Sequence, residues 1–150
     1  MYCNLLWGNT YKTHTANIYL LQKRALKLCY GVKTQTNESL FKLSNKLSIY
    51  NIHSLQTAQL VFQYFQFDCI LPRCISALFK KNSDVHSLYT RSQNNLCLLI
   101  QFGKLNVRKF ATKIFAPLLW NKIPLDIRQI QSFSLFTKQY KIYLSSNSSD

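Results

Sequence analysis

Glycine and proline are both scarce in this sequence, with three of each among 150 residues. A domain built from many short strands needs many tight turns, and these two residues supply much of the turn chemistry. Apolar material is abundant, because hydrophobic residues make up 47% of the chain and aromatic residues 14%. That content is too high for a disordered chain. The composition therefore predicts a single, mainly α-helical domain over residues 1–150 with a packed core.

Acidic residues are scarce as well: five Asp and Glu stand against 19 Lys and Arg, for a formal net charge of +14. Two-metal catalysis needs carboxylates that converge, whereas these five are scattered along the chain. A phosphate-binding glycine loop and the GxSxG and HExxH motifs are missing. We therefore predict a non-enzyme without cofactor or small-molecule substrate, and the basic excess favours RNA or DNA as partner. A merely solvated basic surface, or a piece of a longer protein with acidic parts elsewhere, stays open.

The cysteines do not fit a secreted disulfide scaffold, since they number five and are irregularly spaced. We expect reduced thiols, mostly small core residues. A zinc site could be drawn from Cys69, Cys74, His86 and Cys97, but Pro72 lies between the first two and the later spacing is irregular, so no metal is predicted. No apolar run approaches the ~18 residues of a membrane span, and the N-terminus lacks a signal-peptide pattern. We expect a soluble intracellular protein without a membrane partner.

The first helix is predicted near residues 15–29. Ile18, Leu21, Ala25 and Leu28 recur at the spacing of one helical face, which predicts that this stripe faces the core. Thr13 or Thr15 is the expected N-terminal cap, and Gly31 suits the left-handed position after the helix. Off the stripe, in the last turns, lie three cations that could contact phosphate or simply complement the helix dipole: Lys23, Arg24 and Lys27.

A helix pair is predicted next. A short helix beginning at Asn37 or Ser39 precedes a turn through Ser44 and Asn45. Asn51 is the expected cap of a longer, central helix, which ends before Pro72. The core face of that helix is expected to carry Leu55, Ala58, Phe62 and Phe65. His53 lies in its first turn, where a hydrogen-bonded histidine is more typical than a metal ligand.

Residues 80–107 form an irregular, basic segment in this reading. Gly103 interrupts an extended apolar run, and Ser, Thr and Asn are frequent. Basic side chains continue into the helix that follows. We predict phosphate contacts from this region at Arg91, Lys104, Arg108, Lys109 and Lys113, with Lys23, Arg24 and Lys27 as a second nucleic-acid-binding patch.

The stretch FAPLLWNKIPLDIR, residues 115–128, predicts a rigid corner between two helices. Pro117 either begins a new helix or kinks the one over 110–121. The indole N–H of Trp120 needs an acceptor if it is buried, Asn121 suits a left-handed helix exit, and Pro124 opens a short helix. Trp120, Asn121 and Pro124 are therefore interpreted as structural residues, not catalytic ones.

The last predicted helix carries Phe133, Phe136, Tyr140 and Tyr143 on one face, with Ser132 as its cap. Helical spacing favours the core for these aromatics over base stacking beside Lys138 and Lys141. Residues 145–150 are expected to be a frayed polar tail. Altogether the sequence predicts about six helices.

The corner and the helix after it resemble the C-terminal region of non-LTR (LINE-type, jockey-like) retrotransposon reverse transcriptases. That family has a P-x-x-WN-x-lP corner followed by a short basic FK helix; its lysine is Thr137 here, with Lys138 one place on. The corner's usual preceding glycine is Ala116. The matching positions are Pro117, Trp120, Asn121, Pro124, Ile127 and Phe136.

Three further segments resemble the same family in the same order, and one of them is the helix pair SLFKLSNKLSIYNIHSLQ at residues 39–56. A Y-x-x-x-WG motif before a helix with a QKRA core is carried by Tyr2, Trp7, Gly8 and residues 22–25, and an hxxxTRs motif by His86, Thr90, Arg91 and Ser92. The family's NTR reads Tyr89-Thr90-Arg91, and the chain lacks the YADD-like aspartates and the endonuclease domain. The resemblance therefore implies a post-thumb region without the polymerase core.

Taken as an expectation, the resemblance implies a non-catalytic accessory region that contacts template RNA or target DNA during target-primed reverse transcription in the nucleus. The polymerase core of the parent protein would be a partner. Two alternatives stay open. The region could be a scaffold that braces the polymerase thumb, marked by a large exposed apolar patch, or a relict fragment without function of its own.

Overall fold

The computed structural model describes residues 4–31, 37–66, 71–85, 96–103 and 105–147. Over this part the chain is mainly helical, as predicted, and its only β-pairing is an isolated bridge between Lys81 and Leu98. Eight α-helices are described, more than the six expected, because the single turns α1 and α5 leave no hydrophobic period in a sequence. The elements are α1 (Asn4–Trp7), α2 (Lys12–Tyr30), α3 (Asn37–Ser44), α4 (Ile49–Gln66), α5 (Arg73–Ser76), η1 (Asn82–Asp84), η2 (Asn106–Phe110), α7 (Thr112–Lys122), α8 (Leu125–Arg128) and α9 (Phe133–Ser146).

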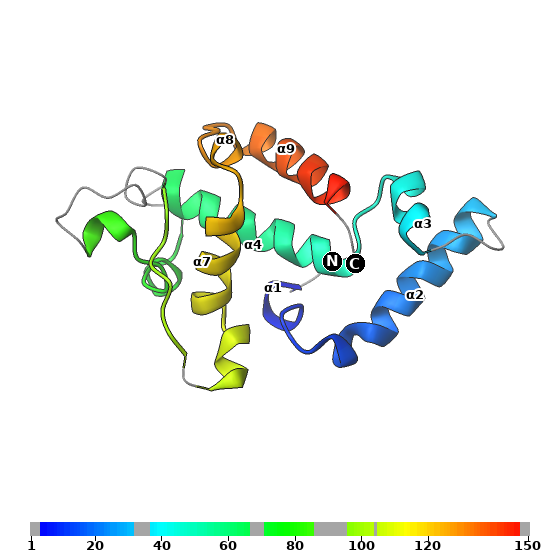
Figure 1. The fold of residues 1–150 in the computed structure, drawn as a ribbon, viewed down its shortest axis with the longest axis horizontal. Coiled ribbons are helices and arrows are strands. Elements are labelled where there is room, and N and C mark those ends of the chain that lie inside the picture. The colour runs from blue at the N-terminus through cyan, green and yellow to red at the C-terminus, as the bar shows by residue number, and fades with distance from the viewer. Residues whose placement is uncertain (1–3, 32–36, 67–70, 86–95, 104, 148–150) are drawn as a thin grey trace.

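Helix α4 is central: α1, α2, α7 and α9 all contact it (Figure 1). Its predicted core face is confirmed, since Ala58 and Phe62 are buried and Leu55 and Phe65 pack against the same cluster. Aromatic rings join the three helices of the core, with Phe62 stacked on Phe136 of α9 at 4.5 Å and Phe65 stacked on Trp120 of α7 at 5.4 Å. Such ring pairs add to the stability that their apolar burial supplies.

The N-terminus of α4 differs from the prediction. The helix begins at Ile49, and the amide of Asn51 donates to the Ser48 hydroxyl oxygen at 3.3 Å, so Ser48 is the capping residue and the expected cap at Asn51 is wrong. Gln22 of α2 is hydrogen-bonded to the same turn. Its side-chain amide donates to the carbonyl of Leu47 at 2.9 Å, and its oxygen accepts from the amide of Ile49 at 3.0 Å.

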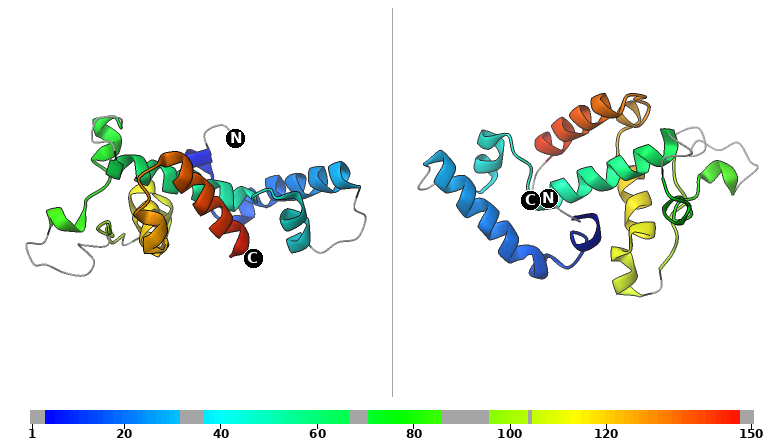
Figure 2. Two further views of the ribbon diagram at one scale, coloured as in Figure 1. Left: turned by 90° about the horizontal axis from the view of Figure 1, so that it is seen from above. Right: turned by 180° about the vertical axis from the view of Figure 1, so that it is seen from behind.

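Helix α2 spans the predicted region and ends at Gly31, whose φ of 64° is the expected left-handed position. Neither threonine caps its start: the residue before the helix is Tyr11, without a side-chain cap bond, and Thr15 is buried beside Tyr50. The predicted core stripe is also wrong. Ile18, Leu21, Ala25 and Leu28 face solvent, and Leu28 is 84% exposed. Helix α2 packs instead through the side that carries Thr15, Tyr19 and Gln22. Helices α2 and α3 lie together at one end of the molecule (Figures 1 and 2).

The corner predicted at residues 115–128 is built by α7 and α8. Pro117 is buried inside α7, so it does not begin a new helix. Ile123 is extended, and Pro124 directly precedes α8. Trp120 is 1% exposed and its indole N–H donates to the carbonyl of Leu96 at 2.8 Å.

Asn121 does not adopt the expected left-handed exit, because α7 continues through it to Lys122. Instead its side chain pairs with the backbone of Leu98, accepting from the amide at 3.0 Å and donating to the carbonyl at 2.9 Å. A side-chain amide thus replaces a strand partner for a residue that is itself 1% exposed.

The expectations for the last helix, the tail and the 80–107 segment are met in part. Phe136 and Tyr140 are buried on α9, but Phe133 is 37% exposed, and Ser132 precedes the helix without a side-chain cap bond. Helix α9 continues through Ser145 and Ser146, so the expected tail does not begin at position 145. Within the irregular 80–107 segment, Leu98 is buried, whereas Phe102 is exposed.

Two further expectations concern the burial of the cysteines and the presence of a membrane-spanning helix. Cys29 and Cys74 are exposed, so the expectation of small core residues is wrong for them, and Cys97 is half-buried. Cys3 and Cys69 lie outside the described residues. Among the helices described, none is both long and apolar enough to cross a membrane.

Candidate nucleic-acid interface

A groove that combines basic and aromatic side chains lies where the α1–α2 junction meets η2 and the first turns of α4. We call it the cationic groove; its volume is about 470 Å³. None of the residues that line it is acidic. They are Gly8, Asn9, Thr10, Tyr11, Lys12, Tyr50, His53, Ser54, Lys109, Phe110 and Phe115.

Two lysines in the groove stand over aromatic rings. The Nζ of Lys109 lies 5.7 Å from the ring centre of Tyr11 and 5.3 Å from that of Phe110, and Lys12 Nζ lies 5.7 Å from the ring centre of Tyr50. Both lysine side chains are exposed, so the ammonium groups stay hydrated and can meet an anion. The groove therefore combines cations with aromatic rings, as sites that bind single-stranded nucleic acid do.

Contacts between distant segments build this groove. The side-chain amide of Asn9 donates to the carbonyl of Phe110 at 2.6 Å, which ties the α1–α2 junction to η2 across 101 residues. The rings of Tyr11 and Phe110 pack edge-on with centres 4.6 Å apart. Gly8 is required on the floor, because a Cβ there would lie 2.6 Å from the His53 ring and would also meet Asn4.

His53 forms part of the groove's floor. It is 5% exposed, its ring lies 5.2 Å from that of Phe115, and it is hydrogen-bonded to the backbone of Leu5. Burial lowers the pKa of His53 below its ordinary value of 6.5, and the hydrogen bond opposes this only in part. His53 is therefore a neutral packing residue at pH 7. Over the described ranges, no group of His, Cys, Asp and Glu is arranged to hold a metal ion.

The predicted phosphate-binding residues fall into separate places. Lys109 lines the groove and Arg108 is exposed beside it in η2, while Lys113 is exposed in the first turn of α7. The second predicted patch lies apart on α2, where Lys23 Nζ stands 4.0 Å from the ring centre of Tyr19. Lys23 and Lys27 are half-buried and Arg24 is exposed. Arg91 and Lys104, like the segment that carries the hxxxTRs motif, lie outside the described residues.

The sequence reasoning missed Lys12, Tyr11 and Tyr50. Phosphate-binding residues were predicted where several cations lie close together in the sequence, whereas Lys12 has no basic neighbour. The available signal was the Tyr11-Lys12 pair at a helix start, but the ring that Lys12 covers comes from α4 and is not visible before folding.

A second, more apolar groove adjoins the first and shares Asn9, Thr10, Tyr11 and Phe110 with it. We call it the apolar groove; its volume is about 770 Å³. Its walls come from α1, α2 and η2, and its lining residues are Leu6, Trp7, Asn9, Thr10, Tyr11, His14, Thr15, Ile18, Val107 and Phe110. Leu6 is 82% exposed and Val107 70% exposed, so apolar side chains are presented to solvent on both sides.

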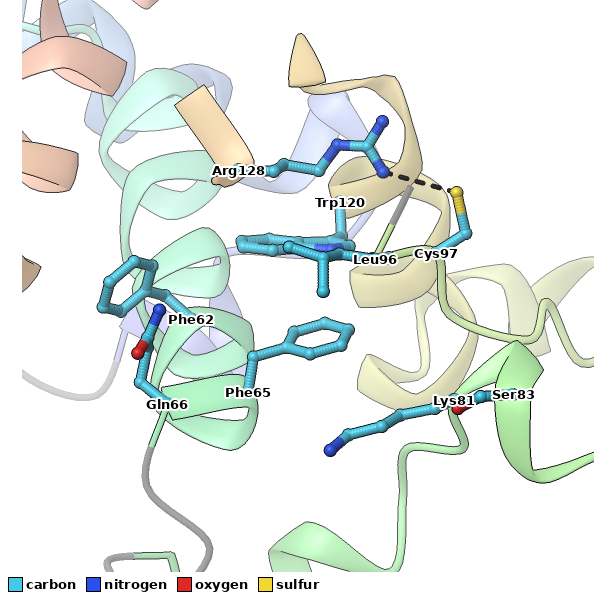
Figure 3. Close-up of a pocket in the computed structure, with 9 residues that line it drawn as sticks. All are labelled: Phe62, Phe65, Gln66, Lys81, Ser83, Leu96, Cys97, Trp120 and Arg128. Atoms are coloured by element: carbon cyan, nitrogen blue, oxygen red, sulfur yellow. Dashed lines mark hydrogen bonds between the residues drawn. The ribbon is translucent and has the colours of Figure 1, made fainter. Parts of the chain in front are cut away.

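A third, smaller pocket of about 180 Å³ lies at the corner (Figure 3). Arg128 of α8 lies over Trp120, and its Nη1 donates to the sulfur of Cys97 at 3.3 Å, while Lys81 enters from another element. Lys81 Nζ stands 5.6 Å from the ring centres of Tyr64 and Phe65. Arg128 is 7% exposed, so it joins α8 to the 96–99 segment as part of the interior.

Comparison with known proteins adds no relative: no family model, no curated protein and no solved structure matches the chain.

Proposed function

We propose that this chain is a non-catalytic nucleic-acid-binding domain, and that the cationic groove contacts template RNA or target DNA as the accessory region of a non-LTR retrotransposon reverse transcriptase. The observation that carries the binding part is the pairing of Lys12 and Lys109 with Tyr50, Tyr11 and Phe110 in one groove without an acidic lining residue. The net charge of +14 supports the same partner class. The retrotransposon part rests on the sequence resemblance.

The direct test is binding of fluorescently labelled RNA and DNA oligonucleotides, followed by anisotropy at low salt. The variant Lys12→Gln/Lys109→Gln removes both groove cations. Lys122→Gln/Lys138→Gln removes the same charge from exposed positions outside the groove. We expect the groove variant to lose about tenfold in affinity and the control less than threefold, since only close phosphate contacts release bound counterions.

Two results would count against the proposal. Absence of binding at low salt would remove nucleic acid as the partner. Equal losses in the groove variant and its matched control would mean that overall charge, and not this groove, holds the ligand.

A second candidate function is a scaffold that braces the polymerase thumb. The observation that favours it is the apolar surface of α1 and α2, where Leu6, Leu21 and Leu28 are 82%, 60% and 84% exposed. Such surfaces mark sites of protein association. A longer protein that includes the polymerase core would then cover this surface, and amide hydrogen exchange in α2 would be slower than in the isolated chain.

A further inference from the structure

The exposed side of α2 has the residue pattern of a buried helical face. Ile18, Leu21, Ala25 and Leu28, the α2 stripe, follow the i, i+3, i+7, i+10 spacing that normally faces a core. Yet Ile18 is 38%, Leu21 60% and Leu28 84% exposed. At its N-terminal end the stripe runs into the apolar groove, because Ile18 belongs to both. Together they form one continuous apolar surface.

We propose that this surface is the docking site for an amphipathic helix from outside this chain, with acidic residues beside its apolar side. The proposal gives the chemistry of the partner for the scaffold function, on which it rests, and the α2 stripe itself lies outside the cationic groove. Its anchors would be leucine-sized side chains seated between α1, α2 and η2 and along the α2 stripe. This is the helix-in-groove mode of recognition.

Shape favours a helix over a flat surface. The apolar groove is concave, walled by Leu6 and Trp7 on one side and by Val107 on the other. A convex helical ridge fits a concave wall, whereas a lipid bilayer offers a plane to an amphipathic helix that lies on it. Leu6 and Val107 thus form sides that a membrane surface would contact unevenly.

Charge favours an acidic partner. Helix α2 contains no Asp or Glu, and exposed Arg24 lies one turn from both Leu21 and Leu28 on the border of the stripe. At the other end, Lys109 stands beside Tyr11. A second copy of this chain would bring a further +14 to the same surface, which opposes self-association. Complementary charge instead guides an acidic helix to the stripe and fixes its direction.

The experiment uses a synthetic helix-forming peptide of about five turns, roughly 18 residues, with leucines on one side and glutamates along its borders. A peptide of identical composition in scrambled order is the control for charge alone. Binding to the full chain is measured by calorimetry. We expect the ordered peptide to bind at least tenfold more tightly than the scrambled one.

Variants then place the peptide on the stripe. Leu21→Gln/Leu28→Gln should weaken the ordered peptide by tenfold or more. Leu135→Gln/Ile142→Gln, at positions 50% and 55% exposed on α9, should leave it unchanged. Because all four side chains are exposed, both variants should fold. Nucleic-acid binding of the stripe variant should equal that of the parent, so failure here is distinguishable from failure of the cationic groove.

Three outcomes would overturn the proposal. The first is equal binding of ordered and scrambled peptides. The second is stripe-dependent binding to vesicles of anionic phospholipid when the ordered peptide fails to bind, which would assign the surface to a membrane. The third is a dimer in sedimentation equilibrium that Leu21→Gln/Leu28→Gln dissociates, which would assign the surface to a second copy.

Discussion

At the scale of single residues, Asn121 supports the core through two hydrogen bonds to the backbone of Leu98. Asn121→Ala removes the partners of both the amide and the carbonyl of buried Leu98, which costs about 1–3 kcal/mol for each group left unpaired. We expect the free energy of unfolding in urea to fall by about 2–4 kcal/mol. Asn17→Ala, at an exposed position of α2, is the control and should change it by less than ~0.5 kcal/mol. Equal changes in the unfolding free energy of the two variants would mean that the two hydrogen bonds of Asn121 contribute nothing.

His53 predicts a dependence of stability on pH. Because burial lowers the pKa of His53 in the folded protein below 6.5, the unfolded chain binds the extra proton more readily. The contribution of neutral His53 to the free energy of unfolding is therefore complete above pH 6.5, and it is lost as the pH falls toward the pKa of His53 in the folded protein. In His53→Gln, urea midpoints between pH 7 and 5 should decline less steeply than in the parent. In His14→Gln, where the histidine is exposed, the decline should be preserved. An unaltered slope in His53→Gln would contradict this.

At the scale of elements, the joint between α2 and α4 depends on Gln22, which pairs with the carbonyl of Leu47 and the amide of Ile49. Gln22→Ala should loosen α2 and α3 without unfolding the core around α4. A loss of about 1–2 kcal/mol corresponds to about a five- to thirtyfold rise in amide exchange in α2 and α3. Gln139→Ala, exposed on α9, should leave exchange unaltered. A uniform rise across all helices would show that Gln22 supports the whole fold.

Prediction from sequence succeeded at this scale where a helical face packs into the core around α4. The core face of α4 and the positions of Phe136 and Tyr140 follow from helical spacing alone. The same reasoning placed the α2 stripe in the core and was wrong. Periodicity reports that a face is apolar, and does not report whether this chain or another molecule covers it. The cap expected at Asn51 was wrong for another reason, because the helix begins at Ile49 and the adjacent Ser48 caps it. The bond from the Ile49 amide to Gln22 of α2 at the same helix start joins residues 27 positions apart and is not visible in the sequence.

At the scale of the whole molecule, the net charge of +14 and the cationic groove predict how nucleic-acid binding responds to salt. Each phosphate contact on a single strand contributes about 0.7 to the slope of log affinity against log salt. Lys12→Gln/Lys109→Gln should therefore flatten the slope by about 1.4. Lys122→Gln/Lys138→Gln should flatten it by less than half as much. Anisotropy titrations over a range of potassium chloride concentrations measure both, and a single common slope would argue against a localised site.

The candidate interface was only partly accessible before the fold was known. Lys109 was predicted from the basic region in which it lies, and Arg108 beside it is exposed as phosphate binding requires. Lys12 and the rings around it were not, because their meeting depends on contacts between residues far apart in the chain. Charge counting identifies a class of partner, whereas three-dimensional packing selects which cations share one site.

The bond from Asn9 to Phe110 has a consequence for how the protein is made. Because it joins residues 101 positions apart, neither groove can exist until the ribosome has released η2, when most of the chain is already synthesised. In a nascent chain that stalls before Phe110, the apolar side chains of α1 and α2 are exposed because η2 is not yet there to pack against them. Premature termination before Phe110 would therefore yield fragments that lack both grooves and expose apolar side chains, which are prone to aggregation.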